Sequence, residues 1–253
     1  SLFSPELRRI QRFVSEAAVG PELERLFSAY GEPKYSGNAE EIITRDFFKD
    51  SRDGVFVDVG AGHAIEGNNS YYLESELGWS GICVDAQPQF AEGYAKERPK
   101  ARYFAAFVSD KDDEKVPFFL IHSDEAFSHS SGDERVAKAT RHKVTKTEAV
   151  SVTLNTLLEK TGVERVDFMN MDIEMGEPSG LAGFDIGKYR PRLVCIESHK
   201  PVRYQLLEYF ARHDYHLLPQ YTFADPRNWY FAPREEIERL REEEMKADHT
   251  FKL

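Results

Sequence analysis

The chain has few cysteines and no long apolar run. It contains two cysteines in 253 residues, and Cys83 and Cys195 both lie inside short apolar stretches. Buried, reduced thiols are expected there, which argues against a disulfide framework and for a cytoplasmic protein. No apolar stretch approaches the roughly 20 residues of a membrane-spanning helix, and residues 1–13 lack the apolar core of a secretion signal. We therefore expect no membrane span.

Positive charge is also scarce. The sequence has 33 Lys and Arg against 44 Asp and Glu, which gives a formal net charge of -11. Polyanions such as DNA, RNA and acidic membranes are bound by clustered Lys and Arg side chains. No nucleic-acid partner is therefore expected, and a small-molecule or protein substrate fits better.

The composition is otherwise that of one globular domain. Hydrophobic residues make up 41% of the chain and aromatic residues 13%, enough to bury one substantial core. Short β-rich runs alternate with longer helical periods, which is typical of parallel strands joined by crossover helices. Strands are expected at 55–59, 81–85, 102–108, 166–171 and 192–197, an antiparallel pair within 215–221 and 228–233, and helices at 4–30, 39–49, 69–77, 88–97, 153–161, 202–213 and 234–249. This pattern predicts an α/β fold with a doubly wound sheet over 51–253, preceded by a helical segment over 1–50.

Residues 116–148 do not fit this alternation. They begin with the apolar run VPFFLIH and continue into a segment rich in Ser, Asp, Lys and Thr, which is too long for a simple connection. We interpret the stretch as a lid or an inserted hairpin. If it closes over the substrate, His129 is the histidine expected to face it.

The stretch VFVDVGAG, residues 55–62, runs from a strand into a glycine turn. Ligands of open α/β sheets bind beyond the carboxyl ends of the strands, and Gly60 and Gly62 would let the backbone approach a ligand closely. A nicotinamide or flavin site would have a third glycine at position 65, where this chain has Ile65. Asp58 would repel a diphosphate but suits the ammonium and sulfonium groups of S-adenosylmethionine.

Asp85 ends the second predicted strand, in the stretch GICVDAQP. An acid at this position can accept hydrogen bonds from two ribose hydroxyls. Asp58 and Asp85 together therefore predict a site for a cationic nucleoside, although either acid alone is also compatible with a simple turn residue.

Three stretches resemble the FkbM family of S-adenosylmethionine-dependent methyltransferases: FVDVGAG at 56–62, NNSYYLESELGWSGICVDAQPQF at 68–90, and 166–199, which begins VDFMNMDIEMGE. The resemblance runs from about residue 52 to 200. It implies a seven-stranded class I methyltransferase fold and methyl transfer to a small-molecule acceptor, usually a hydroxyl on a sugar or polyketide. The residues that match the family's cofactor positions are Asp58, Gly60, Gly62, Asn69, Ser70 and Asp85, and the predicted cofactor site also includes Ala61, Ala86 and Asp172. The chain departs from the family's DIEGAE pattern at Met175, which replaces a glycine, and this departure bears on the acceptor.

Four polar residues are candidates for catalysis. Asp172 and Glu174 follow the strand at 166–171, and Glu197 and His199 end the strand at 192–197, so the four side chains can converge above the cofactor. His199 would act as a general base oriented by Glu197 or Glu174. Alternatively, Asp172, Glu197 and His199 would hold a divalent ion such as Mg²⁺. We favour the metal-free mechanism here because this spacing is not diagnostic of any metal; some of these acids also fit a simple strand-capping role.

Two other functions fit the same sequence. One is an N-methyltransferase acting on an amide or amine, and an amine acceptor needs no strong base. The other is a noncatalytic nucleoside-binding scaffold, in which the terminal helices form the interface of a homo-oligomer.

Overall fold

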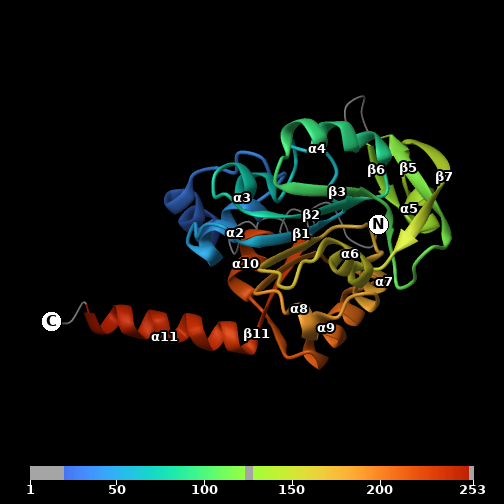
Figure 1. Cartoon of the computed structure of the whole chain (residues 1–253). Coiled ribbons are helices and arrows are strands. Elements are labelled where there is room, and N and C mark those ends of the chain that lie inside the picture. The colour runs from blue at the N-terminus through green and yellow to red at the C-terminus, as the bar shows by residue number, and fades with distance from the viewer. Residues whose placement is uncertain (1–19, 123–127, 251–253) are drawn as a thin grey trace, which may run out of the picture.

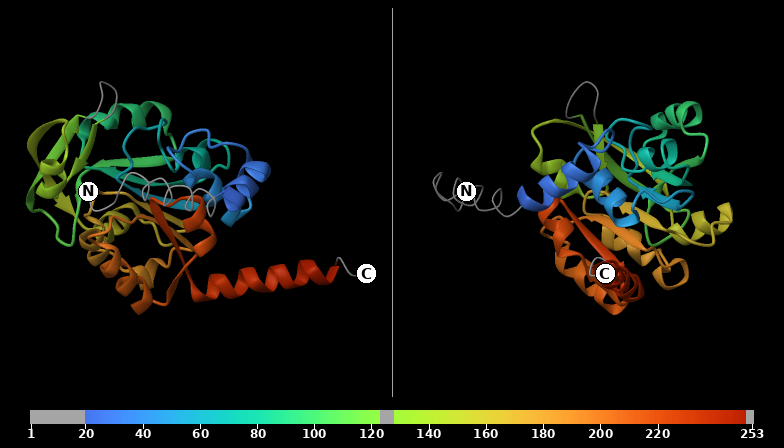
Figure 2. Two further views of the ribbon diagram at one scale, coloured as in Figure 1. Left: turned by 180° about the vertical axis from the view of Figure 1, so that it is seen from behind. Right: turned by 90° about the vertical axis from the view of Figure 1, so that its left-hand side faces the viewer.

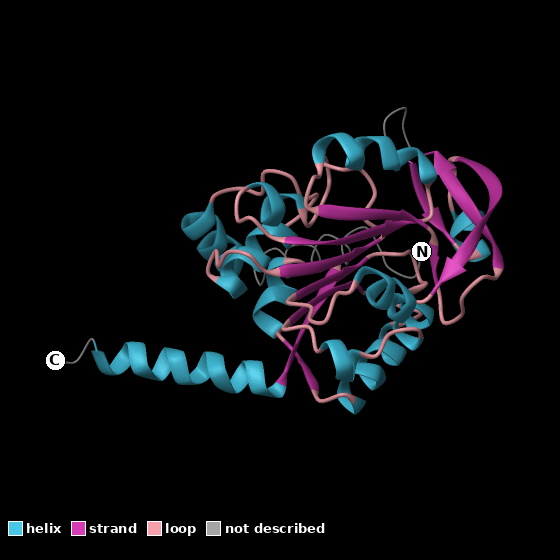
Figure 3. Ribbon diagram, in the orientation of Figure 1, coloured by secondary structure: helices cyan, strands magenta, loops and turns pink. Residues whose placement is uncertain are grey.

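A computed structural model of the protein describes residues 20–122 and 128–250, and Figures 1 and 3 show its ribbon. The strands are β1 (Val55–Val59), β2 (Ser80–Asp85), β3 (Ala101–Ala105), β4 (Phe107–Val108), β5 (Lys115–His122), β6 (Ser128–Ser131), β7 (Lys143–Val152), β8 (Phe168–Met171), β9 (Leu193–Glu197), β10 (Tyr215–Leu217) and β11 (Asn228–Pro233). The helices are α2 (Glu40–Phe48), α3 (Tyr71–Ser75), η1 (Pro88–Phe90), α4 (Ala91–Glu97), α5 (Glu134–Ala139), α6 (Leu154–Thr161), α7 (Glu177–Ala182), α8 (Ile186–Tyr189), α9 (Arg203–Arg212), α10 (Pro219–Ala224) and α11 (Arg234–Thr250).

Seven strands form the main sheet in the order β10-β11-β9-β8-β1-β2-β3. Strands β3, β2, β1, β8 and β9 pair in parallel, whereas β11 runs antiparallel to both β9 and β10. A parallel sheet closed by one reversed strand next to its edge is the arrangement of class I methyltransferases. It confirms the predicted α/β fold class and its antiparallel closing pair.

Helices cover both faces of this sheet. Phe56 and Cys83 pack with α2, α3, α4 and α10 on one face, while Val57 and Ile82 pack with α6, α7, α8 and α9 on the other. Successive side chains of a strand point to opposite faces, so strands buried on both faces appear in the sequence as continuous apolar runs. Figure 1 shows α4 and α6 on opposite sides of the sheet. With both faces covered, the carboxyl ends of the strands are left as the place for polar residues.

The described part of the N-terminal segment packs onto the same core. Residues 20–30 are helical, and Leu26 joins Ile42 of α2 in the cluster that covers one face of the sheet. The predicted helix over residues 4–19 lies outside the described residues. The division of the chain at residue 50 stays a prediction.

A second, four-stranded sheet has the order β4-β7-β5-β6. Strand β5 pairs antiparallel with both β6 and β7, and α5 lies between β6 and β7 in the chain. The described residues within 116–148 therefore form an antiparallel insertion with a short helix. The single strand predicted at 102–108 is instead divided at Ala106 between β3 of the main sheet and β4 of the small one.

Other differences from the predicted elements are local. The strand predicted from Tyr215 ends at Leu217, because Pro219 begins α10, and proline at the first turn of a helix favours helix initiation. Helices α7 and α8 have six and four residues, too few for a helical period to be visible in the sequence. Helix α11 extends away from the rest of the structure (Figures 1 and 2). Within the described residues, no helix combines the length and apolar composition needed to cross a membrane.

Candidate active site

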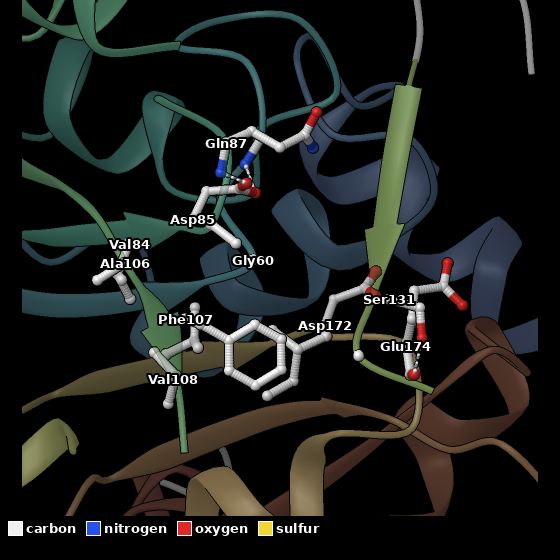
Figure 4. Close-up of a pocket in the computed structure, with 15 residues that line it drawn as sticks. Gly60, Val84, Asp85, Gln87, Ala106, Phe107, Val108, Ser131, Asp172 and Glu174 are labelled. Carbon is white, nitrogen blue, oxygen red and sulfur yellow. Dashed lines mark hydrogen bonds between the residues drawn. The ribbon is translucent and has the colours of Figure 1, made fainter. Parts of the chain in front are cut away.

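A cleft lies at the carboxyl ends of β1, β2 and β8, and the small sheet forms part of its wall (Figure 4). Its lining residues are Val59, Gly60, Gly62, Val84, Asp85, Ala86, Gln87, Ala106, Phe107, Val108, Ser131, Gly132, Asp172, Ile173 and Glu174. The space inside it, including the open mouth, is about 750 Å³. The cleft therefore brings the glycine turn after β1, the end of β2 and the loop after β8 together around one space.

The two glycines of the first turn have different surroundings. Gly60 has a φ of 78°, and a Cβ atom placed on it would lie 1.8 Å from the backbone oxygen of Asp172. Gly62 has a φ of 58°, and a Cβ atom there would meet no atom within 4 Å. Gly60 thus permits β1 and the residue after β8 to approach, whereas Gly62 leaves open space for a ligand.

Asp85 is held at the edge of the cleft by the backbone. Its Oδ2 accepts a hydrogen bond from the amide of Gly62 at 3.1 Å, and its Oδ1 accepts one from the amide of Gln87 at 2.9 Å. Burial raises the pKa of the Asp85 carboxyl to about 6. Each carboxylate oxygen has a second lone pair, so both can still accept hydrogen bonds from ligand hydroxyls.

Asp58 lies behind the cleft and does not line it. Its side chain is buried, with a relative exposure of 1%; its oxygens accept hydrogen bonds from Ser70 Oγ at 2.6 Å and Asn170 Nδ2 at 2.9 Å. Burial raises the pKa of the Asp58 carboxyl. The position predicted to face the cation of the ligand is therefore corrected: Asp58 ties β1 to β8 and to the start of α3.

Arg98 completes this buried network. Its Nη2 donates to Ser70 Oγ at 3.1 Å, and its guanidinium favours the charged form of Asp58. Asn69 Nδ2 donates to Asn170 Oδ1 at 3.1 Å. Asn69 and Ser70 thus do not contact the cleft themselves. They hold Asn170 and Asp58, which lie on the strands below it.

The predicted cofactor positions therefore divide into two groups. Gly60, Gly62, Asp85, Ala86 and Asp172 line the cleft, whereas Asp58, Ala61, Asn69 and Ser70 do not. Of the second group, Asp58, Ala61 and Ser70 are buried inside the protein, and Asn69 donates a hydrogen bond to Asn170.

The four candidate catalytic residues converge as the strand order predicts. His199 Nε2 lies 3.0 Å from Glu197 Oε2 and 3.2 Å from Glu174 Oε2. Asp172 and Glu174 line the cleft, whereas Glu197 and His199 do not. Burial, together with the charge of Asp172, raises the pKa of Glu197 well above its ordinary value.

The residues that could share a metal ion differ from the predicted set. Ligand atoms of Glu174, Glu197 and His199 lie within 4.8 Å of one another, so in this group Glu174 takes the place predicted for Asp172. Glu174 is brought there by an unusual backbone, because it and Met175 have φ values of 52° and 73°. A left-handed conformation is strained for a residue with a side chain, and Met175 is the position where the FkbM pattern has glycine.

Sequence reasoning missed the residues that the small sheet and its neighbours bring to the cleft. Phe107 lines the cleft together with Asp85 and Asp172, and Figure 4 shows its ring beside Asp172. Ser131 Oγ donates to the backbone oxygen of Glu174 at 2.9 Å. Phe107 lies within a β-rich run, so nothing in the sequence distinguished it as a cleft residue. No local pattern indicated that Ser131 would line the cleft. His129 belongs to β6, but its side chain lies outside the described part of the structure.

Comparison with solved structures finds methyltransferases of low similarity. A TehB-like SAM-dependent methyltransferase from Corynebacterium glutamicum is 16% identical, with a TM-score of 0.39 over 90% of this chain and 97% of that one. A SAM-dependent methyltransferase from Geobacter sulfurreducens, solved with S-adenosyl-L-homocysteine, is 8% identical, with a TM-score of 0.39 over 81% of this chain and 78% of that one. A precorrin-6y C5,15-methyltransferase from Geobacter metallireducens is 12% identical, with a TM-score of 0.38 over 70% and 71%. These scores are too low to bear on the site.

No curated protein matches the chain significantly. The family described as the methyltransferase FkbM domain matches residues 58–223. This range contains the glycine turn, Asp85 and all four candidate catalytic residues. Because the match covers more than half of the chain, the protein belongs to the FkbM family of methyltransferases.

Proposed function

We propose that the protein transfers the methyl group of S-adenosylmethionine to a hydroxyl oxygen of a small molecule. The observation that carries this proposal is one cleft lined both by Gly62 and Asp85 and by Asp172 and Glu174. The first pair suits a nucleoside, and the second lies where an acceptor would meet the reacting group.

The residues present fit the cofactor. Gly62 leaves open space beside the backbone, and Asp85 has oxygen lone pairs to accept the ribose hydroxyls. Phe107 and Val108 add apolar surface to the same wall. When bound, S-adenosylmethionine supplies a methyl group on a sulfonium, which leaves as a thioether as the acceptor oxygen bonds to the methyl carbon.

The protein must align the acceptor hydroxyl with the methyl group and assist the loss of the hydroxyl proton. A hydroxyl is a poor nucleophile until its proton is removed or its pKa is lowered. Glu174 reaches the cleft wall, and its carboxylate contacts His199, which in turn contacts Glu197. Support for a hydroxyl acceptor comes from this group, because an amine acceptor needs no such arrangement.

Isothermal titration calorimetry tests the cofactor site. We expect the protein to bind S-adenosylmethionine and S-adenosylhomocysteine in the micromolar range. Asp85→Asn should weaken both by about tenfold or more, since one hydrogen bond to a charged group contributes roughly 1.5–3 kcal/mol. Asp53→Asn is a matched control: Asp53 is exposed and precedes β1, at the opposite end of that strand from the cleft.

An acceptor panel tests the reaction. We expect methyl transfer to hydroxyl compounds such as sugars and polyketides, and little to amines of similar size. Absence of heat with either nucleoside ligand would contradict the cofactor site. Binding without turnover on any acceptor would instead favour a scaffold, and selective turnover of amines would favour an N-methyltransferase.

A further inference from the structure

We propose that Glu174, Glu197 and His199 bind a divalent cation at the inner wall of the cleft. One ligand atom from each residue lies within 4.8 Å of the other two. The residues come from the loop after β8 and from the end of β9, two adjacent parallel strands whose pairing fixes their relative positions. The inference rests on the proposed function for its role in catalysis, but the binding of the ion is testable by itself.

The carboxyl groups at this place have few cationic partners in the protein. Asp172, Glu174, Glu177 and Glu197 are gathered at the ends of β8 and β9. Within the described residues, ion pairs to these four carboxylates come from His199 alone. Buried carboxyl groups this close together are costly to ionise unless a cation pairs with them, and a divalent ion would supply that pairing.

An independent observation points to a ligand at the same place. Glu197 has a relative exposure of 5%, and within the described structure its Oε2 is buried with no hydrogen-bond partner. Nearly all buried polar side-chain atoms are hydrogen-bonded. This oxygen is the atom that lies 3.0 Å from His199 Nε2, so it points into the group of three.

The spacing of the three atoms suits coordination. Metal–oxygen bonds of about 2.1 Å at right angles place adjacent ligand atoms about 3.0 Å apart. The observed separations from His199 Nε2 are 3.0 Å to Glu197 and 3.2 Å to Glu174. A single imidazole nitrogen donates one hydrogen at most, which two carboxylates would have to share. With the Nε2 lone pair and both carboxylates directed at one ion, all three groups are satisfied.

The ligand types indicate which ion fits. Carboxylate oxygens suit Mg²⁺, Ca²⁺ and Mn²⁺, whereas imidazole suits later transition metals. We take Mn²⁺ as the probe because two carboxylates and one imidazole fall between these preferences. Glu174 lines the cleft, so an ion held by it has coordination positions open to an acceptor. Such an ion would bind the acceptor oxygen and lower the pKa of its hydroxyl, and His199 would then be a ligand, in place of the general base favoured from the sequence.

Electron paramagnetic resonance measures Mn²⁺ binding directly, without cofactor or acceptor. When Mn²⁺ is added to the chelator-treated full chain, the signal of free Mn²⁺ should be lower than in buffer. The decrease should correspond to one bound ion per chain. Glu197→Gln keeps the shape of the side chain and should raise the Kd by at least about tenfold. His199→Ala should do the same, and it provides a second variant at a position whose side chain is 38% exposed, in case the buried substitution prevents folding.

His216→Ala is the matched control. His216 Nε2 lies 3.2 Å from Asp214 Oδ1 on an exposed part of the chain, so it is a histidine–carboxylate pair without the second carboxylate. The control should bind Mn²⁺ as the wild type does. The proposal is overturned if the wild-type chain leaves the signal of free Mn²⁺ unchanged, or if Glu197→Gln and His199→Ala bind Mn²⁺ as tightly as the control. Calorimetry with S-adenosylhomocysteine in the presence of chelator tests the cofactor site separately. Binding of S-adenosylhomocysteine without binding of Mn²⁺ would overturn the metal site alone.

Discussion

Gly60 and Gly62 both have a positive φ, but only Gly62 faces open space. A methyl group on Gly60 would collide with the backbone of Asp172, and the one on Gly62 would point into the cleft. The first glycine is therefore required by the packing of β1 against the loop after β8. The second is available to the ligand.

Alanine substitutions should separate these two roles. Gly60→Ala combines a backbone clash with an unfavourable φ and should reduce the free energy of unfolding by about 3 kcal/mol or more. Gly62→Ala should cost about 1 kcal/mol in stability from its φ alone, yet weaken S-adenosylhomocysteine binding about tenfold. Urea unfolding and calorimetry measure the two effects. Undiminished affinity in Gly62→Ala would show that the ligand does not approach this turn.

Glu177 provides a test of the buried acidic group by pH. It is 0% exposed, its Oε1 accepts from the amide of Ile173, and its Oε2 has no hydrogen-bond partner within the described structure. Burial raises the pKa of its carboxyl from 4.5 to about 7. The folded chain thus holds this proton more tightly than the unfolded chain, and stability falls as pH rises from about 4.5 to 7.

Glu177→Gln should remove that loss. At pH 8 the variant should be more stable than the wild type by about 2 kcal/mol, because the glutamine stays neutral and its oxygen can still accept from Ile173. At pH 4.5 the two should be nearly equal, which makes the low-pH comparison the internal control. Urea unfolding in the presence of a chelator measures both. Equal stability at both pH values would mean that Glu177 is not held protonated by the fold.

Asp58 and Asp85 show what the sequence can predict of the site and what it cannot. Both acids were expected at the carboxyl ends of adjacent strands, and both lie there. Asp85 is the last residue of β2 and reaches the amide of Gly62, whereas Asp58 lies one residue before the end of β1 and beside Ser70. Asp58 pairs with Cys83, so it lies two residues farther from the cleft along the sheet than Asp85. The register between the two strands thus decides which carboxylate faces the ligand, and neither strand's own sequence specifies that register.

At the scale of the elements, local patterns predicted the main sheet well and the small sheet poorly. Strand β1 matches its predicted bounds, 55–59, because its residues are strand-forming and are followed directly by a glycine turn. In contrast, the run 102–108 was expected to be one strand and is shared between two sheets. The pairing of β4 with the end of β7 joins residues more than forty positions apart, and nothing local specifies such a contact.

The insertion matters because it supplies part of the cleft wall. Strands β5 and β7 pair over eight consecutive positions, which gives the small sheet a rigid centre. Ser131 at the end of β6 bonds to the backbone of Glu174, so the insertion is fastened to the same loop that carries the acidic group. Part of the cleft wall therefore comes from an element whose contacts could not be predicted from its polar sequence.

At the scale of the whole molecule, α11 is the feature that departs from a compact shape. Its first turns carry Ile237 and Leu240, which pack against the core, and farther along the helix Met245 is 59% exposed. The figures show the helix extending away from the main body (Figures 1 and 2). Apolar contact with the sheet is thus concentrated in the first half of this helix.

Truncation tests whether the second half contributes to stability. Deletion of residues 242–253 keeps Ile237 and Leu240 and should change the Tm by less than about 2 °C, since a loss of 1 kcal/mol corresponds to roughly 2–4 °C in a chain of this size. Leu240→Ala, by comparison, removes a contact with the core and should lower the Tm measurably. A scanning-calorimetry series at several protein concentrations gives both values. If the truncated chain instead lost several degrees, and lost more at high concentration, the end of α11 would be packing against a second copy, as in the homo-oligomer expected from the terminal helices, because only association makes the Tm depend on concentration.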